Sequence, residues 1–342
     1  MQHYDICLIG FGNVGKAFAT LLDNKKQALA QQGLDFRITA IATGSHGNAL
    51  NPEGIDPIRA IQAYQDNAIP ALSSPKTNIE SIKDFIRASK ADFLVETSPV
   101  NYETGEPAIT HIKAGLSSGM HAVSANKGPV VHAFRSLKML AKENDKQFLF
   151  ESAVMDGAPI FSVFREALPS LNVEGFEGIL NSCTNLLLEK MEAGKSFEDA
   201  VAFAQSIGIA ETDPSGDIDG WDAAVKVAAL VTVMMDHPMT PQDVERKGIR
   251  EITPDDIQKG LREGKRWKLV CSADKTNEGV AASVQPKLVA STSPLYAVNG
   301  TSSLVIFKTD ILPGLGILES DPGPETTAYG LLADMLNILK VG

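Results

Sequence analysis

The fold is set by a short stretch near the N-terminus, which reads Asp5-Ile-Cys-Leu-Ile-Gly-Phe-Gly-Asn-Val-Gly15. The apolar run before Gly10 is typical of a buried strand, and apolar residues then recur at a helical period over residues 14–32. Glycines at this spacing between a strand and a helix allow a tight turn and close packing of the helix on the strand. Because the start of such a helix offers free N–H groups to a phosphate, the stretch predicts a dinucleotide site.

Strands and helices continue to alternate through the first 150 residues. Strands are predicted at residues 36–42, 92–96, 121–125 and 147–154, and helices at 81–89, 106–118 and 129–144. Residues 48–57 are rich in Asn, Pro and Gly and are expected to form a loop. Alternation of this kind implies a parallel sheet with helices on both faces. We therefore predict an α/β, Rossmann-type doubly wound domain over residues 1–150.

A different pattern begins after residue 150. Helices are predicted at residues 159–168, 197–207 and 221–235, and strands at 176–181, 269–273, 281–286 and 303–307. This order indicates an α+β domain with antiparallel character over residues 151–315. A helix is predicted at residues 326–339, in a C-terminal segment (316–342) that we expect to pack back on the first domain.

Charge and composition narrow the classes of partner. The chain has 342 residues, with 31 Lys and Arg against 42 Asp and Glu, a net charge of −11 that disfavours nucleic acid and anionic membranes. No apolar run approaches the roughly 18 residues that a membrane span needs. The N-terminus enters a strand at once, so no signal peptide is expected, and the three cysteines lack metal-site spacing. A cytoplasmic protein with reduced thiols is the prediction.

Cofactor contacts are predicted on the glycine turn and at the end of the second strand. NAD-binding domains usually place an acid at that strand end, where it holds the ribose hydroxyls. Here the position reads Ala42-Thr-Gly-Ser-His46, with no acid to repel a 2′-phosphate and no arginine to bind one. This favours NADP, or the use of both NADP and NAD. The predicted contacts on the turn are Gly10, Gly12, Asn13, Val14 and Gly15.

Two other strand ends carry polar residues at the same predicted edge of the sheet. Thr97 and Ser98 follow one strand and are expected to face the nicotinamide or its ribose, unless they only cap the next helix. Lys127 follows the next strand, just before a helix that is predicted to begin at Pro129. A lone lysine is usually a solvated surface group. Its place at a strand end, among small residues, makes Lys127 a catalytic candidate.

An acidic segment precedes the apolar helical run at residues 227–235. Unpaired charge is costly to bury, so either these acids are a solvated loop or they bind a cationic ligand where a helix enters the core. Asp222 and Lys226 are four residues apart on one helix face and can pair or address one ligand. A calcium loop is excluded because no glutamate closes the spacing. The segment's charged residues are Glu211, Asp213, Asp217, Asp219, Asp222 and Lys226.

Taken together, these motifs resemble homoserine dehydrogenase in its short form, without a kinase or regulatory domain. The resemblance runs through nearly the whole chain. Its motifs are the glycine turn, Glu96-Thr-Ser-Pro-Val-Asn-Tyr-Glu-Thr-Gly-Glu-Pro107, Ser124-Ala-Asn-Lys127, Gly178-Ile-Leu-Asn-Ser-Cys-Thr-Asn185, Gly208-Ile-Ala-Glu-Thr-Asp-Pro214 and Asp217-Ile-Asp-Gly-Trp-Asp-Ala-Ala-Val-Lys226.

The resemblance implies an enzyme that interconverts L-homoserine and L-aspartate-4-semialdehyde with NADP or NAD, as a homodimer or higher homo-oligomer. Glu211 would hold the substrate ammonium group, and Asp222 would position the amino acid or a water. Lys226 and Lys127 would contact the reacting oxygen and share the proton transfer, and Lys127 would also touch the cofactor. The remaining substrate-binding residues would be Asn181, Thr184 and Asp217. A structural role is also open for Asp217, as for Asp213 and Asp219.

The resemblance also implies a loop for a monovalent cation, which makes sodium a candidate ligand. The loop residues would be Glu151, Val154, Asp156 and Ala158. The chain departs from the family pattern at Met155-Asp156, at Ser182-Cys183 and in the segment 321–328. The first two departures would fall near the nicotinamide and the substrate.

Two other functions fit the same sequence. A related oxidoreductase that acts on another small amino or hydroxy acid would share most of these residues. A non-catalytic NAD(P)-binding sensor would bind the cofactor without turnover. The sensor does not explain why Lys127 and Lys226 accompany Glu211 and Asp222.

Overall fold

A computed structural model describes residues 1–75 and 79–340 of the chain. The chain divides into two compact units, one of Met1–Pro159 with the segment that starts at Gly323, and one of Ile160–Pro322. The boundaries predicted from the sequence, at residues 150 and 315, lie somewhat earlier along the chain. Among the helices of the described residues, none combines the length and the apolar character needed to cross a membrane.

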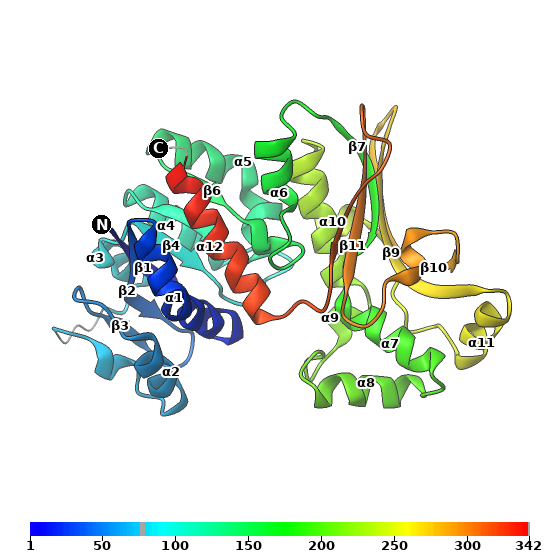
Figure 1. Cartoon of the computed structure of the whole chain (residues 1–342), viewed down its shortest axis with the longest axis horizontal. Coiled ribbons are helices and arrows are strands. Elements are labelled where there is room, and N and C mark those ends of the chain that lie inside the picture. The colour runs from blue at the N-terminus through cyan, green and yellow to red at the C-terminus, as the bar shows by residue number, and fades with distance from the viewer. Residues whose placement is uncertain (76–78, 341–342) are drawn as a thin grey trace. The chain divides into compact units, whose positions relative to one another are not determined.

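The first unit is built on a mostly parallel sheet with the strand order β3-β2-β1-β4-β5-β6 (Figure 1). Neighbours from β2 to β6 pair in parallel, and β3 alone runs antiparallel, to β2. The chain order reverses between β1 and β4, and ligands of such sheets bind at the carboxyl ends of the strands on either side of this point. The strands are β1 (Gln2–Ile9), β2 (Leu34–Ala42), β3 (Asn48–Leu50), β4 (Phe93–Glu96), β5 (His121–Ser124) and β6 (Phe148–Leu149).

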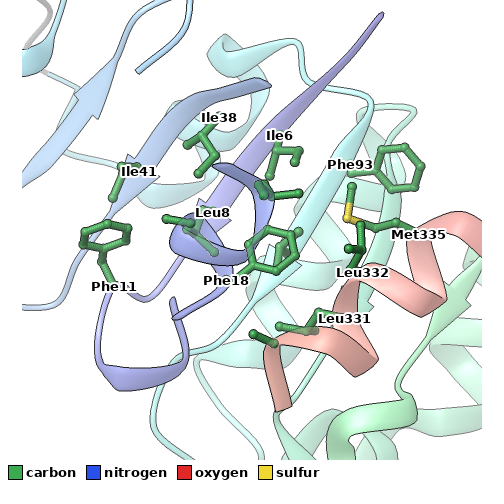
Figure 2. Close-up of a cluster of buried hydrophobic side chains, with 14 of the residues drawn as sticks. Ile6, Leu8, Phe11, Phe18, Ile38, Ile41, Phe93, Leu331, Leu332 and Met335 are labelled. Atoms are coloured by element: carbon green, nitrogen blue, oxygen red, sulfur yellow. The ribbon is translucent and has the colours of Figure 1, made fainter. Parts of the chain in front are cut away.

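Helix α12 completes the core of this unit. Figure 2 shows Leu331, Leu332 and Met335 of α12 in one cluster with Phe18 of α1 and Phe93 of β4. All five side chains are 2% exposed or less, so this contact removes a large apolar surface from water. The helices of the unit are α1 (Asn13–Gln31), α2 (Pro57–Gln65), α3 (Ile82–Ser89), α4 (Ala108–Ser117), α5 (Lys127–Glu143) and α12 (Pro324–Lys340).

Three predictions for this unit are wrong in detail. The predicted loop at residues 48–57 contains β3, and α2 begins at Pro57 because the Asp56 carboxylate caps the Arg59 N–H (2.8 Å). The strand predicted to reach residue 154 ends at Leu149, and Glu151–Ala153 form a short 3₁₀ helix. Helix α5 begins at Lys127 rather than Pro129, because the Asn126 side chain accepts from the Gly128 N–H.

The second unit contains a mostly antiparallel sheet with the order β12-β11-β7-β9-β10-β8. Only the β8–β10 pair is parallel among the strand pairs of the described residues. The strands are β7 (Val173–Ile179), β8 (Glu245–Arg246), β9 (Lys265–Thr276), β10 (Gly279–Ala290), β11 (Ser303–Thr309) and β12 (Leu315–Glu319). The helices include α6 (Ile160–Ser162), α7 (Ser182–Glu192), α8 (Phe197–Ser206), α9 (Ser215–Ile218), α10 (Trp221–Met234) and α11 (Pro254–Arg262).

Helices α7 and α10 both contact the β9 strand of this sheet. The α10 prediction is confirmed to within one residue. The segment predicted as a helix at residues 159–168 forms α6 and then a π-helix over Val163–Ala167. Helices α7 and α11 and strand β12 were not predicted. In α7, Leu186, Leu187 and Leu188 are all buried, so its sequence lacks the one-sided apolar stripe of a surface helix.

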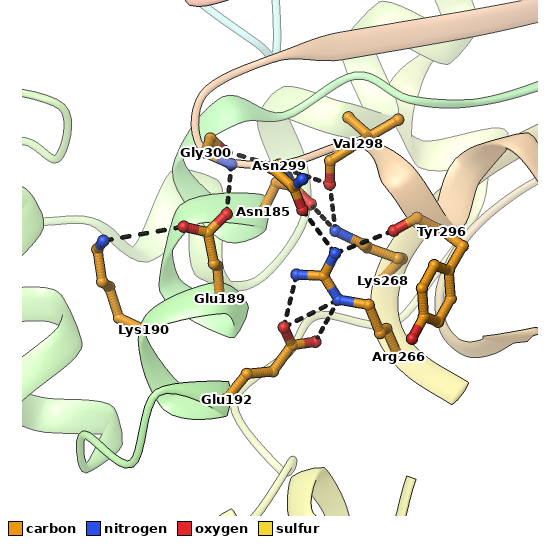
Figure 3. Close-up of polar contacts among 10 residues, drawn as sticks. All are labelled: Asn185, Glu189, Lys190, Glu192, Arg266, Lys268, Tyr296, Val298, Asn299 and Gly300. Atoms are coloured by element: carbon orange, nitrogen blue, oxygen red, sulfur yellow. Dashed lines mark hydrogen bonds and ion pairs between the residues drawn. The ribbon is translucent and has the colours of Figure 1, made fainter. Parts of the chain in front are cut away.

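Charged side chains fasten the segment at residues 294–300 onto α7 and β9 (Figure 3). The Arg266 guanidinium binds Glu192 in a bidentate pair, with 3.0 and 2.5 Å contacts, and donates to the Tyr296 carbonyl (3.0 Å). The Lys268 ammonium donates to Asn185 Oδ1 (2.8 Å) and to the Val298 carbonyl. We call Asn185, Glu189, Glu192, Arg266 and Lys268 the loop clamp.

Candidate active site

The glycine turn after β1 has two glycines that the fold requires and one that it does not. A Cβ at Gly10 (φ +90°) would lie 2.6 Å from the Thr97 carbonyl, and one at Gly15 would lie 2.5 Å from the Gly10 oxygen. A Cβ at Gly12 would meet none of the described atoms within 4 Å. Gly12 is also the N-cap of α1, where no described side chain caps the helix. The turn therefore keeps open space in front of uncapped N–H groups, which suits a phosphate.

The two polar residues after β4 have different tasks. The Thr97 hydroxyl donates to the Gly10 carbonyl (2.9 Å) and so braces the glycine turn. The Ser98 backbone N–H donates to the Glu96 carboxylate (2.8 Å). The Ser98 hydroxyl is buried and has no hydrogen-bond partner among residues 1–75 and 79–340. Buried polar atoms are usually satisfied, so Ser98 is the residue of this pair that fits a ligand contact.

A buried carboxylate–histidine contact supports this strand end and was not foreseen from the sequence. Glu96 is 0% exposed, and its second carboxylate oxygen lies 2.7 Å from Nδ1 of His111 on α4. Glu96 therefore joins α4 to the backbone of Ser98 and fixes the loop between them. The sequence shows an acid, Glu96, at the end of an apolar strand, which indicates a special role. It does not show that the partner of Glu96 is His111, fifteen residues later.

Lys127 is held at the same sheet edge by its neighbour. Asn126 is buried, and its amide donates to the carbonyls of Ser98 (3.0 Å) and Pro99 (3.2 Å). Because Asn126 also caps α5, it fixes the end of β5 to the end of β4. Lys127 is the first residue of α5, where the helix dipole opposes a positive charge. A cation held in this unfavourable place fits a functional role better than a stabilising one.

These features together fit a dinucleotide. The turn offers an uncapped helix N-terminus and open space at Gly12, and the adjacent strand end offers an unsatisfied buried hydroxyl at Ser98. Gly10, Gly15 and Thr97 build the turn itself. The residues that would touch a cofactor directly are Gly12, Asn13, Val14 and Ser98, with Lys127 at the same edge.

The second unit brings four of the predicted substrate residues into direct contact. Asn181 caps α7, and its Oδ1 accepts from the Thr184 N–H and hydroxyl, both at 2.8 Å. The Asn181 amide donates to Asp217 (2.7 Å) and to Asp222 (3.0 Å). Lys226 lies 3.1 Å from Asp222, and its ammonium donates to the Leu180 carbonyl (2.7 Å). We call Asn181, Asp217, Asp222 and Lys226 the lysine–carboxylate cluster.

Two carboxylates lie close together in this cluster, and the pKa of one of them is raised. Burial, and then the neighbouring charge of Asp222, raise the pKa of Asp217. Burial and the adjacent Asp217 raise the pKa of the Cys183 thiol as well, so the thiol stays protonated and donates to that carboxylate. The side chains of Asp222 and Lys226 are each 13% exposed. The cluster is therefore a partly dry site in which a lysine and two acids are fixed within reach of one another.

The other acids of the segment lie outside the cluster. Asp213 is exposed, and hydrogen bonds from the Ser215 side chain and then from its backbone N–H (3.1 Å) lower the pKa of the Asp213 carboxyl. Asp219 pairs with Arg250 (3.0 Å) and therefore holds the turn before α10 in place. Glu211 is exposed, and no hydrogen bond or ion pair from the described part of the chain engages its carboxylate. The structure thus leaves Glu211 apart from Lys226, and its ammonium-binding role stays a prediction.

The loop expected to hold a monovalent cation is tied to α12. The Glu151 N–H donates to the buried Asp334 carboxylate (2.7 Å), and the Ser152 hydroxyl donates to the Thr327 carbonyl (2.7 Å). Asp156 adopts a positive φ (41°) and accepts from the Thr327 hydroxyl (2.5 Å). Over residues 1–75 and 79–340, no three His, Cys, Asp or Glu side chains gather in a metal-binding group. These contacts tie the loop to α12, and sodium at this loop stays a prediction.

Known proteins resemble this chain over its full length. The family model for homoserine dehydrogenase matches residues 159–336. The NAD(+)-dependent homoserine dehydrogenase of Pseudomonas canavaninivorans is 33% identical, over 99% of this chain and 97% of that protein. The homoserine dehydrogenase of Methanocaldococcus jannaschii is 36% identical, over 98% of each chain.

A solved structure agrees with these relatives. A hyperthermophilic archaeal homoserine dehydrogenase in complex with NADPH superimposes with a TM-score of 0.84 at 29% identity, covering 100% of this chain and 99% of that one. The resemblance expected from the glycine turn and the acidic segment is thereby confirmed. The chain belongs to the homoserine dehydrogenase family.

Proposed function

We propose that this chain interconverts L-homoserine and L-aspartate-4-semialdehyde with NADP or NAD as the cofactor. The observation that carries the proposal is the lysine–carboxylate cluster, in which Lys226 is fixed between a carbonyl and the Asp222 carboxylate. The named relatives act on homoserine, and one uses NAD(+) while another was solved with NADPH. The cofactor residues proposed above support the use of such a dinucleotide.

The chemistry needs a cation and a proton donor at one oxygen. When bound, the reduced nicotinamide supplies the hydride. As the C4 carbonyl carbon of the semialdehyde accepts it, the carbonyl oxygen becomes an alkoxide, which a cation stabilises. Lys226 then gives its proton to that oxygen. The Asp222 carboxylate holds the Lys226 side chain in position for this transfer. In the oxidation direction, the neutral Lys226 amine takes the hydroxyl proton of homoserine.

The other site residues are proposed to bind and orient. Asn181, with Thr184 behind it, holds the two carboxylates of the cluster at a fixed separation, and Asp217 contributes to substrate binding through that arrangement. Glu211 is proposed to bind the substrate ammonium group, because its exposed carboxylate is available for a cation. Lys127 is the second lysine proposed for the proton transfer.

Three wider properties belong to the same proposal. Cys7, Cys183 and Cys271 are free and buried thiols, which supports a reducing, cytoplasmic environment. Membership of the family supports a homodimer or higher homo-oligomer. Sodium at the loop of Glu151, Val154, Asp156 and Ala158 is a further candidate ligand.

The test is a substrate panel with both cofactors. Purified protein is mixed with L-homoserine, malate, lactate and other amino alcohols, each with NADP+ or NAD+, and formation of reduced cofactor is followed. We expect reduction that depends on L-homoserine. Turnover with only another substrate supports the related oxidoreductase, and cofactor binding without any turnover supports the sensor. Either result overturns the proposal.

A further inference from the structure

We propose that Lys16 and His46, gathered on the ring of Tyr64, recognise the 2′-phosphate of NADP and make NADP the preferred cofactor. The inference rests on the proposed function in that it assumes a dinucleotide bound at the glycine turn. It goes further because it assigns the choice between NADP and NAD to named side chains that the sequence did not suggest.

Lys16, His46 and Tyr64 lie where a fold of this kind binds the adenosine ribose of a dinucleotide. The Gly10 N–H donates to the carbonyl of Ala42 (2.8 Å), so the end of β2 adjoins the glycine turn. Residues 43–47 leave β2 at this point and contain no acid. In folds of this kind the ribose 2′ position is recognised at the end of the second strand. Charge placed here therefore decides whether a 2′-phosphate is bound or repelled.

Side chains from three segments meet at this edge. The His46 ring stacks on Tyr64 of α2, with 4.0 Å between centroids and an angle of 23° between the planes. The Lys16 ammonium, one residue after the glycine turn, lies 5.0 Å from the centroid of the same ring. Phe11 packs edge-on against Tyr64 (5.8 Å) and holds it from the core. Two basic side chains are thus placed together by one aromatic ring.

The His46 ring is also fixed at one of its nitrogens. The His46 backbone N–H donates to the Thr43 hydroxyl (2.8 Å), and Nδ1 of the ring lies 2.8 Å from the Ser45 hydroxyl. Among the described residues, Nε2 has no hydrogen-bond partner. With Nδ1 occupied, Nε2 is the nitrogen that remains to donate to a ligand oxygen. The exposed Ser45 can add its hydroxyl to the same ligand.

Neither basic residue is neutralised within the protein. No carboxylate of residues 1–75 or 79–340 forms an ion pair with Lys16 or His46. The chain carries 42 acids against 31 lysines and arginines, so two basic side chains brought together without an acid stand out. Packing on the Tyr64 ring alone would explain the position of the Lys16 ammonium. It does not explain why a second basic side chain, His46, packs on the same ring. A dianionic phosphate ester matches both.

The experiment compares binding of NADP+ and NAD+ by calorimetry. Variants are Lys16→Gln and His46→Gln, with Lys25→Gln as a control that removes the same charge from an exposed position of α1. We expect each test variant to weaken NADP+ binding roughly tenfold or more, because charge-assisted hydrogen bonds are lost, with NAD+ binding changed less than about threefold. His46→Asp should reverse the preference, since its carboxylate repels the phosphate and accepts from the ribose hydroxyls.

The outcome separates this inference from the proposed function. If Lys16→Gln and His46→Gln weaken both cofactors equally, or neither, the inference is wrong whether or not homoserine is oxidised. If they weaken NADP+ alone while homoserine gives no turnover, the inference holds and the proposed function fails. Unchanged thermal unfolding of each variant excludes misfolding as the cause. Binding of 2′-AMP, and not 5′-AMP, that is lost with Lys16→Gln gives the same answer from the phosphate alone.

Discussion

Two polar clusters adjoin helix α7, the lysine–carboxylate cluster at its N-cap and the loop clamp along the helix, and they differ in how their charges are matched. In the loop clamp, Arg266 meets Glu192 in bidentate geometry, and Lys268 donates to an amide and a carbonyl. In the lysine–carboxylate cluster, Asp217 and Asp222 share the amide of Asn181.

We expect this difference to separate residues that stabilise the fold from residues that bind a ligand. In the loop clamp, each of the two cations donates to more than one acceptor, and these bonds stabilise the segment at 294–300. Two acids that share one amide lie close together, and burial and then the neighbouring charge of Asp222 raise the pKa of Asp217. Perturbed titration of this kind concentrates at functional sites. The pKa of Lys268 in the loop clamp is shifted as well, so the crowding of two acids beside Lys226, and not the pKa shift, is what distinguishes the lysine–carboxylate cluster. We expect this cluster to be the functional one, and the following variants test the contrast.

Removal of the cluster lysine should give the largest effect. Lys226→Ala is expected to lower kcat for homoserine oxidation by about a hundredfold or more, as for other losses of acid–base catalysis. Lys259→Ala, which removes an exposed lysine of α11, is the control and should leave kcat unchanged. Steady-state kinetics of the two folded variants decide the matter. A near-normal rate for Lys226→Ala would remove the proposed role.

The clamp lysine should instead change how stability depends on pH. Burial lowers the pKa of Lys268 from 10.5 to about 8, so the folded protein binds fewer protons than the unfolded chain between these values. The cost of charging Lys268 is present below pH 8 and disappears as the pH rises to 10.5. Unfolding in urea should show this rise, of about 3 kcal/mol, in the wild type and not in Lys268→Met.

Lys265→Met is the matched control for that measurement, because Lys265 is a more exposed lysine of the same strand. It should keep the wild-type pH dependence. If the free energy of unfolding rises equally with pH in the wild type and in both variants, then charging Lys268 does not destabilise the folded protein.

Loss of the shared amide should affect both activity and stability. Asn181→Ala leaves Asp217 and Asp222 without their common donor and removes the cap of α7, so kcat/KM is expected to fall roughly tenfold and stability by about 1 kcal/mol. The control is Ser196→Ala. It removes the comparable cap of α8, where the Ser196 hydroxyl accepts from the Asp199 N–H (3.0 Å). This control should lose stability alone. If both variants keep full kcat/KM, the amide has only a capping role.

Removal of one carboxylate charge should change stability with opposite signs in the two clusters. Asp217→Asn keeps the hydrogen bond from Asn181 but removes a charge that the fold disfavours, so we expect a gain of about 1 kcal/mol at pH 7, together with a lower kcat/KM. Glu192→Gln removes the charge that Arg266 requires in a largely buried pair and should cost about 2 kcal/mol. Urea unfolding at pH 7 measures both changes. Losses of equal size would show that the two clusters do not differ in the way described.

The fold was predictable where the signal was local. The glycine turn fixed α1 and the first strand, and the apolar period predicted α10 to within one residue. Helix α7 was missed because Leu186, Leu187 and Leu188 form a continuous apolar run without helical spacing. Strand β3 was missed because three residues in an Asn-rich segment carry too little pattern.

The site was predictable for pairs on one element and not for contacts across elements. The spacing of Asp222 and Lys226 predicted that they share a helix face and either pair or address one ligand, and in the structure they lie 3.1 Å apart. Asn126 reaches the carbonyl of Ser98 only because parallel strands end side by side. Lys268 gave no signal, since a lysine in a strand is ordinarily exposed, yet it is 1% exposed here.

The position of α12 in the first unit has a consequence for synthesis. Residues 324–340 are made after the whole second unit, but their apolar face covers Phe18 and Phe93. While the ribosome translates the residues between, these two aromatic side chains lack their cover. A nascent chain of this protein therefore carries an open apolar surface through nearly all of its elongation, and early release would leave that surface exposed to chaperones and to aggregation.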